Sequence, residues 1–585
     1  MSLRDFCYCY LGWLGIPLAN LFKSIEKDLD VSFIQIHPEV YFSIIGLASI
    51  IGLVIGGGIA AGFSWLIHLP IQMMPPLVFI GAIGGAIAPI GVGILYPKMM
   101  ASNRLDSLKV EIPYASMFIS VMTSGGLSPF DSFMRLNKMD MLPEIKKEVN
   151  RIETIIYSTG SDPLSALELA AREVDVKEYK ELLLGYALSV RTGGDTLHYL
   201  FSQTHSMFNS LASRIKSVAD NMGLIMEAYI ILSVLGVLGI FLIFVIGLAL
   251  PQSGMNISSS TFFLFSFIIM PAMSGLFIFV GDTGQINYPV SDWRPYYVLF
   301  GVFPFVLGFM SQAVLPFFRP QLLYVPFIRD LIISIRIMAG FAEGAEPAIG
   351  LSLSLILLSV PVAILDFRSS SSNSGLQSGV ITFLRDLVES RKSGLSPEKC
   401  INALCQRDYK QFTEHLQNIN LKIKLGYPIK TIYEEMKEDI KDWHVRLNIY
   451  LLIDSMEIGG GSEESLEALA EFAETTQRLE KEKRSVLLPL VIVPYIGALI
   501  LAGTLVMFLS FFSNSAGMGI SVPITELYKT LLTPISLHVF NLGLVTGKIS
   551  TGRVSAGFKH SILMVLVSLV AVWMIAQIGG GSIFG

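Results

Sequence analysis

The stretches SGGLSPFDSF (124–133) and KSGLSPEKCI (392–401) share the tetrapeptide Gly-Leu-Ser-Pro, and this duplication decides how the chain is organised. After Gly126, landmark glycines follow at positions 160 and 193. After Gly394, they follow at positions 426 and 459, at closely matched intervals. Each series then passes through a charged stretch into a long apolar run. Landmarks in the same order, with a matched exit, indicate an internal repeat.

The landmarks have a local physical meaning as helix boundaries. Glycine tolerates the left-handed conformation found just after a helix C-terminus. Serine suits the N-cap and proline the first helical position, as Ser128-Pro129 and Ser396-Pro397 provide. Asp195 and Ser462 are expected to cap the helices after the last glycine turns. The repeat therefore predicts two small helical bundles, at 98–222 and 368–485, and helix punctuation alone is enough to explain the glycines.

Composition places these bundles in a membrane protein. Of 585 residues, 52% are hydrophobic and only 15% are charged, against about 25% charged in soluble domains. A spanning helix needs about 20 apolar residues. The runs that qualify are 41–68, 76–95, 223–250, 261–280, 297–315, 348–365, 486–511, 531–545 and 562–578. The fold class expected is all-α, a polytopic membrane protein with about nine transmembrane helices and two repeated cytoplasmic bundles.

Two of the apolar stretches are ambiguous. The run 531–545 is short and contains Pro534. The run 321–341 carries Arg329, Asp330 and Arg336, each of which costs about 2.5–3.5 kcal/mol at the bilayer centre, so we expect an interfacial helix there.

Charge sets the expected topology. Lysine and arginine concentrate in the two bundles and in the loop 547–560. For a protein of the cell membrane, the positive-inside rule places all three of these segments on the cytoplasmic side. The predicted domains are then a cytoplasmic amphipathic segment (1–40), a transmembrane hairpin (41–97), bundle 1 (98–222), four spans (223–367), a linker with bundle 2 (368–485), and three spans (486–585). The linker is the stretch RSSSSNSG at 368–375, which we expect to be flexible.

Short-range patterns add expectations about packing. The pairs Gly58/Gly62 and Gly81/Gly85 have GxxxG spacing, which indicates close helix contacts within the chain or between protomers. On the helix before the seventh span, Glu474–Arg478 and Glu480–Arg484 have the i,i+4 spacing of ion pairs.

Motifs for chemistry are scarce. GLVTGKIS at 543–550 is one residue short of a phosphate loop, and Ile549 stands where a hydroxyl is needed. The histidines show no metal-ligand spacing, and His538 is expected to be satisfied or interfacial. The net charge of −5 does not suggest nucleic-acid binding. Because the spans are poor in ionisable residues, ion-coupled transport is disfavoured. We expect no cofactor, no metal and no catalytic site.

One acidic cluster is a candidate binding surface. Glu457, Glu463 and Glu464 surround the last glycine turn of the second repeat. They suit either a cation or a basic partner surface, or they simply begin a solvated helix, where the dipole favours them.

Taken together, these residues resemble a known family. Two bundles, each holding Gly-Leu-Ser-Pro, a central glycine turn and a Gly-Gly turn before a long span, resemble the type II secretion system F domain. That family supplies the membrane platform of secretion systems and type IV pili. The nine-span form is similar to the archaeal platform protein of the archaellum and related pili. A transporter or permease, or a membrane enzyme, are the alternatives.

The resemblance implies partners rather than catalysis. It implies a separate hexameric secretion ATPase in the cytoplasm, pilin or archaellin subunits, the lipid bilayer, and a homodimer. The family often has an acidic residue before the last glycine turn, which Glu457 matches and Arg191 does not. The partner-binding positions carried over from it are Gly126, Ser128, Pro129, Arg191, Gly193, Gly194, Asp195, Gly394, Ser396, Pro397, Glu457, Gly459, Gly460, Glu463 and Glu464.

Overall fold

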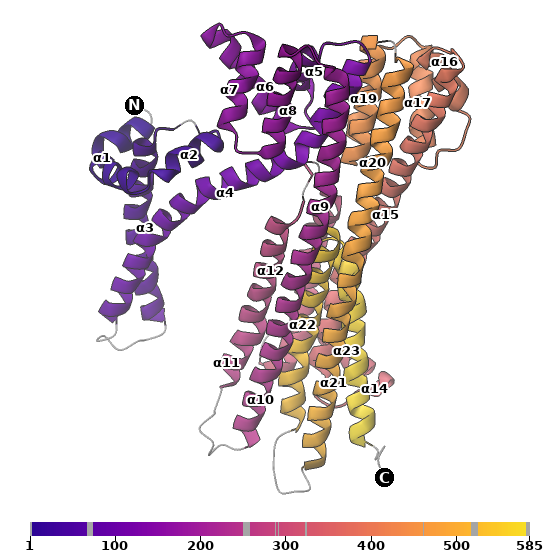
Figure 1. The fold of residues 1–585 in the computed structure, drawn as a ribbon. Helices are drawn as coiled ribbons and strands as arrows, with labels where there is room; N and C mark the ends of the chain where they lie inside the picture. The colour runs from indigo at the N-terminus through magenta and orange to yellow at the C-terminus, as the bar shows by residue number, and fades with distance from the viewer. Residues whose placement is uncertain are drawn as a thin grey trace. The chain divides into compact units, whose positions relative to one another are not determined.

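A computed structural model of the chain describes residues 3–34, 36–66, 74–249, 258–286, 288–289, 292–321, 324–459, 461–515 and 524–580. These residues form helices and connecting turns without a β-strand, so the all-α prediction is confirmed (Figure 1). Within this described part, nine helical stretches are long and apolar enough to cross a membrane. They are Pro38–Gly62, Gly81–Ser124, Thr196–Gly247, Thr261–Gly284, Arg294–Phe318, Glu346–Lys392, Glu463–Phe511, Thr525–Thr551 and Gly557–Gln577. Each contains or overlaps one of the predicted runs.

The chain forms two compact units, which are described one at a time. The first comprises Met1–Ser116 and Phe133–Gln203, and the second comprises Met117–Ser132 and Thr204–Gly585. The first unit therefore holds the N-terminal segment, the first two spans and most of bundle 1. The second holds the remaining spans and all of bundle 2.

The first unit begins with a packed helical hairpin. Its helices are α1 (Leu3–Leu21), α2 (Ser24–Val31), α3 (Pro38–Leu66), α4 (Met74–Ser124), η1 (Leu136–Lys138), α6 (Pro143–Thr159), α7 (Pro163–Glu173) and α8 (Lys177–Arg191). Helices α3 and α4 touch through glycine backbones. A Cβ on Gly52 would overlap the carbonyl of Gly85, and one on Gly56 would overlap that of Gly81. Close packing at Gly81 and Gly85 is thus confirmed within the chain.

The other predicted glycine pair is not part of this contact. A Cβ on Gly58 or Gly62 would meet no atom within 4 Å in the described part of the chain. The prediction that these two residues pack closely is therefore wrong for contacts within the chain. The hairpin crosses earlier along α3, where Gly52 and Gly56 face the other helix.

A buried ion network joins the N-terminal segment to bundle 1. Arg104 of α4 bonds to the carbonyl of Val31, and its guanidinium lies 4.0 Å from the ring centroid of Phe33. The same guanidinium pairs with Glu144 at 3.1 Å and with the fully buried Glu148. One cation thus fixes α2 against α6. Outside this contact, α1 exposes Tyr10, Trp13 and Leu21, a pattern compatible with the predicted membrane-surface role.

The second unit is built around long helices that run from polar segments into the spans (Figure 1). Helix α9 (Thr196–Ile230) continues through a π-helical turn, η2 (Ile231–Leu235), into α10 (Gly236–Ala249). Helix α15 (Glu346–Lys392) has 47 residues, a length of about 70 Å. Helix α20 (Glu463–Leu487) continues through a 3-10 turn, η5 (Leu488–Val491), into α21 (Ile492–Ser515). Apolar spans and polar bundle are therefore parts of the same helices.

The rest of the second unit completes the bundle and the spans. Bundle 2 adds α16 (Pro397–Leu404), α17 (Phe412–Lys424), α18 (Ile429–Asp439) and α19 (Trp443–Gly459). The remaining elements are α11 (Ser259–Leu264), η4 (Phe265–Ile269), α12 (Met270–Gly284), α13 (Arg294–Phe318), α14 (Pro326–Ala339), α22 (Ile524–Thr551) and α23 (Gly557–Gly580). The short α5 (Pro129–Arg135) follows the first Gly-Leu-Ser-Pro turn.

The weakest predicted span turns out to be the most buried. In α22 the apolar window is 83% buried, against 11% for the window in α13. Its backbone also lies against α23, where a Cβ on Gly547 would overlap Gly557. Because α22 faces protein rather than lipid, it carries polar side chains that lower its hydropathy, and Pro534 lies within the 28-residue helix. The apolar run at 531–545 is thus only the middle of a helix that is long enough to cross the membrane.

The stretch 321–341 does not provide a tenth span. Helix α14 has 14 residues, about 21 Å, which is shorter than the hydrocarbon core of about 30 Å. Arg336 lies 3.5 Å from Glu343 and 3.4 Å from Glu346, so its charge is paired at the start of α15. The prediction that this segment does not cross the membrane agrees with its length.

The predicted flexible linker is wrong. Residues 368–375 lie in the uninterrupted helix α15. The backbone at Gly375 is packed so closely that a Cβ there would overlap Gln411, and one at Gly379 would overlap the carbonyl of Tyr409. Tertiary packing from a distant loop holds a stretch that its own composition would leave unstructured.

Candidate partner-binding surface

The first Gly-Leu-Ser-Pro turn has the predicted geometry. Gly126 has φ +102°, in the region that favours glycine. Helix α5 begins at Pro129, and the backbone N–H of Asp131 donates to Ser128 Oγ at 3.1 Å. Ser128 Oγ donates in turn to the Asp131 carboxylate at 2.6 Å. The N-cap prediction for Ser128 is confirmed, and the loop closes on itself through one serine and one aspartate.

The second turn has a similar backbone conformation, but different hydrogen bonds hold it in place. Gly394 has φ +84°, and α16 begins at Pro397. Ser396 occupies the N-cap position, yet its side chain makes no capping hydrogen bond. Instead Arg391 donates to the carbonyl of Leu395 at 2.6 Å and to that of Gly461 at 2.9 Å. The second copy is therefore held by an arginine that donates to two carbonyls, and not by a serine hydroxyl that caps the helix.

The last glycine turn of the second repeat is shifted from its predicted place. Gly459 is the final residue of α19, and Gly460 lies outside the described residues. The left-handed residue is Gly461, with φ +63°. Here a Cβ would lie 2.9 Å from Pro397 Cγ. The prediction of Gly459 as the left-handed residue is wrong, because it is Gly461 that packs against the other turn. Ser462 then caps α20, accepting from Ser465 N at 3.2 Å, as predicted.

The last glycine turn of the first repeat lies in the first unit. Gly193 has φ +68°, and Gly194 N donates to the carbonyl of Ser189 at 2.8 Å. Asp195 caps α9 by accepting from His198 N at 3.0 Å, which confirms that prediction. Arg191 pairs with Glu168 of α7 at 3.1 Å. Its charge is thus partly used to hold bundle 1 together.

Two of the predicted sites come together at the start of α20. A Cβ on Gly125, next to the first turn, would lie 3.7 Å from Ser465 Cβ, while Gly461 contacts the second turn. Ser465 Oγ lies 3.3 Å from Ser455 Oγ of α19. We call this the double-turn face, made up of exposed residues from both turns and the first turn of α20. Its members are Gly126, Ser128, Asp131, Leu395, Glu463 and Glu464.

The double-turn face is acidic. Asp131, Glu463 and Glu464 are exposed, and Glu463 and Glu464 lie in the first turn of α20, where the helix dipole favours negative charge. Nearby, Lys392 pairs with Glu467 at 3.2 Å. The described residues contain no group of three or more histidine, cysteine or acidic side chains that could hold a metal ion.

Both i,i+4 pairs predicted along α20 are replaced by contacts to other helices. Glu474 bonds to the guanidinium of Arg385 on α15. Glu480 accepts a hydrogen bond of 2.6 Å from Tyr288 in the loop after α12, and lies 4.0 Å from His444. Among the described residues, neither carboxylate forms an ion pair with the arginine four positions later. These longer-range contacts anchor α20 to its neighbours.

Two groups of polar contacts lie near the ends of the spans, and sequence reasoning missed both of them. Asp282 at the end of α12 pairs with Lys548 of α22. Asp366 of α15, 3% exposed, accepts from Ser555 Oγ at 2.7 Å and lies 3.6 Å from Arg553. The available signal was that each acidic residue follows directly after an apolar run.

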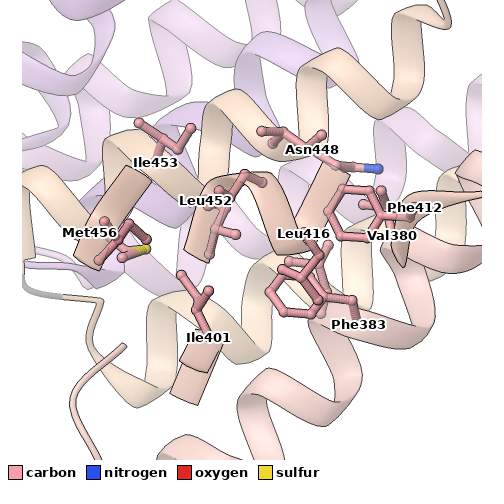
Figure 2. A pocket seen from close by; sticks show the side chains of 13 residues that line it. Val380, Phe383, Ile401, Phe412, Leu416, Asn448, Leu452, Ile453 and Met456 are labelled. Atoms are coloured by element: carbon pink, nitrogen blue, oxygen red, sulfur yellow. The ribbon is translucent and has the colours of Figure 1, made fainter. Parts of the chain in front are cut away.

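Two cavities of the second unit differ in size and lining. Figure 2 shows side chains that line a cavity in the core of bundle 2, among them Phe383, Leu452 and Asn448. The volume of this cavity is about 20 Å³. Ligand pockets usually measure about 300–1,000 Å³, so this one is a packing void. A polar groove of about 670 Å³ lies along α15 and α20, and Arg385 and Glu474 in its wall already form an ion pair.

Comparison with known proteins assigns the repeat. Residues 115–244 and 383–510 each match the family model described as type II secretion system (T2SS), protein F. The chain therefore carries two copies of this domain, and each copy runs from a bundle into a span. An uncharacterized protein of Methanocaldococcus jannaschii is 18% identical over 520 residues, covering 81% of each chain. No solved structure matches. Platform proteins of the F family are non-enzymatic membrane proteins, and this chain is likewise a non-enzymatic multi-pass membrane protein.

Proposed function

We propose that the chain is the platform protein of an archaeal type IV filament, either an archaellum or a pilus, in the cytoplasmic membrane. It couples a separate hexameric secretion ATPase to the insertion of pilin or archaellin subunits. One observation carries this proposal: the chain holds two copies of the type II secretion F domain, each continuous with a membrane span. The archaeal relative supports the archaeal form.

The coupling is mechanical. Helix α15, the α9–α10 pair and the α20–α21 pair each run from the polar bundles into the apolar spans. A helix transmits displacement along its axis because its backbone hydrogen bonds are internal. The contacts of Glu474 and Glu480 join α20 to α15 and to the loop after α12. A push or rotation applied to bundle 2 therefore moves several spans together.

The double-turn face is the surface proposed to meet the ATPase. Glycine turns keep its backbone exposed, and Arg391 fixes the second turn against Gly461. Its three exposed carboxylates complement a basic surface on the motor, which increases the association rate and selects the orientation. The chain is proposed to act as a homodimer with both bundles in the cytoplasm.

Co-purification tests the proposal. The full chain is expressed in membranes with a hexameric secretion ATPase from the same genome, and retention of the ATPase is measured. We expect retention by the wild-type chain and its loss in the double variant Glu463→Lys/Glu464→Lys. The matched control is Glu434→Lys/Glu438→Lys, two exposed carboxylates on α18 away from the face.

The outcomes separate the hypotheses. Loss in the face variant with retention in the control supports the platform function and locates the motor contact. Equal retention in both variants rejects the double-turn face while keeping the platform function. Failure of the wild-type chain to retain any such ATPase, in well-folded preparations, rejects the platform function and favours the transporter or permease alternative, which solute-uptake assays then examine.

A further inference from the structure

We propose that residues 369–375 of α15 form a latched hinge, a weak stretch of helix that two polar contacts hold in place between the spans and bundle 2. When the latches are closed, span and bundle form one rod. When they open, the stretch unwinds and α15 no longer connects bundle 2 rigidly to its own span. The inference concerns the chain alone and does not depend on which partner acts on bundle 2.

The composition of the stretch disfavours helix. Its sequence is SSSSNSG, without a strong helix former. Serine and asparagine lower helix stability because their side chains compete for nearby backbone groups, and glycine loses the most backbone entropy. Five of the seven residues are half-buried and two are exposed, and none has an apolar side chain, so hydrophobic burial offsets little of this cost. The stability of such a helix therefore depends on tertiary contacts at its two ends.

The first latch ties the beginning of the stretch to the loop before α13. Ser369 Oγ donates to the Asp292 carboxylate at 2.6 Å. The other oxygen of that carboxylate accepts from Arg294 N at 3.0 Å, at the start of α13. Asp292 therefore joins α15 directly to the N-terminus of a different span.

The second latch ties the same turn to the connection between α22 and α23. Arg553 donates to Ser370 Oγ at 3.3 Å and lies 3.6 Å from the buried carboxylate of Asp366, one turn earlier on α15. Ser555 adds a hydrogen bond of 2.7 Å to Asp366. Since Asp366 is buried, removing its cationic partner leaves a charge that is costly to keep there. Arg553 and Ser555 thus hold the beginning of the stretch through Ser370 and Asp366.

The far end of the stretch belongs to bundle 2. Gly375 lies against the side-chain amide of Gln411, and Gly379 lies against the backbone carbonyl of Tyr409. Between the two ends, the side chains of residues 371–374 have no tertiary hydrogen bond or ion pair recorded in the described part of the chain. One end of a weak helix is thus bound to the spans, the other to bundle 2, and the middle is held by neither. This is the arrangement of a hinge.

Hydrogen exchange on the full chain in lipid nanodiscs tests the proposal, read peptide by peptide along α15. We expect residues 369–375 to exchange at least tenfold faster than residues 380–388 of the same helix. The variants Asp366→Asn and Arg553→Gln, which open the second latch, should raise that rate at least tenfold again. Lys559→Gln, an exposed lysine shortly after the same turn, is the matched control and should change nothing.

A second variant keeps the test decisive if opening the latch disturbs the fold. Replacing residues 371–374 by alanine adds helix propensity and removes no recorded contact, so it should slow exchange in the stretch at least tenfold. Wild-type exchange in 369–375 as slow as in 380–388 would overturn the hinge. So would an alanine variant that exchanges at the wild-type rate.

Discussion

Replacing Gly461 by alanine tests whether the two turns of the second repeat are locked together. Gly461 has φ +63°, and an L-residue in the left-handed region costs about 1–2 kcal/mol. Its new Cβ would also lie 2.9 Å from Pro397 Cγ, an overlap that costs about 1–3 kcal/mol when neighbours must shift. We expect the first turns of α20 to be destabilised by about 2–5 kcal/mol in total.

Native-state hydrogen exchange measures this locally. A loss of about 1.4 kcal/mol lowers protection tenfold, so the protection of the amides at the start of α20 should fall by about 30- to 4,000-fold. The matched control is Gly394→Ala. Gly394 has φ +84°, but its Cβ would meet no described atom within 4 Å, so only about 1–2 kcal/mol is expected. Adding Pro397→Ala to Gly461→Ala should recover most of the difference, because it removes the overlapping Cγ. Equal effects of the two glycine substitutions, or no recovery, would refute the contact between the turns.

Three further changes test the packing. Arg104→Met removes a cation from the fully buried Glu148 and should cost about 3–5 kcal/mol in thermal unfolding of the purified chain; a loss below about 1 kcal/mol would contradict the buried network. Val380→Ile adds one methyl group beside the cavity of about 20 Å³ in Figure 2 and should raise stability by up to about 1 kcal/mol, whereas a lower unfolding temperature would mean that the cavity is already filled. His538→Leu replaces a buried side chain whose ring nitrogens have no hydrogen-bond partner among the described residues, so stability should rise by about 1–3 kcal/mol; a fall would show that the histidine has a partner.

The sequence by itself determined which segments become helices and where most of them end. Hydropathy located every span found in the described residues, because burial in lipid is set by the composition of a run of about 20 residues. The glycine and cap positions at Gly126, Gly394 and Ser462 were also readable. A left-handed turn takes a glycine at that position, and a free N–H at a helix start takes an acceptor side chain two or three residues earlier, so both can be predicted from a few neighbouring residues.

Only the tertiary structure decided what those segments touch. The Ser-rich stretch at 368–375 reads as a linker, yet contacts with Asp292, Arg553 and Gln411 make it helix. Glu474 was expected to pair along its own helix, and it pairs across to α15 instead. Gly461 rather than Gly459 is left-handed because it packs against a turn far away in the sequence. A local sequence pattern reflects interactions between residues that are close together in the chain. Packing brings together residues that are far apart in the sequence, and no local pattern indicates which of them will be in contact.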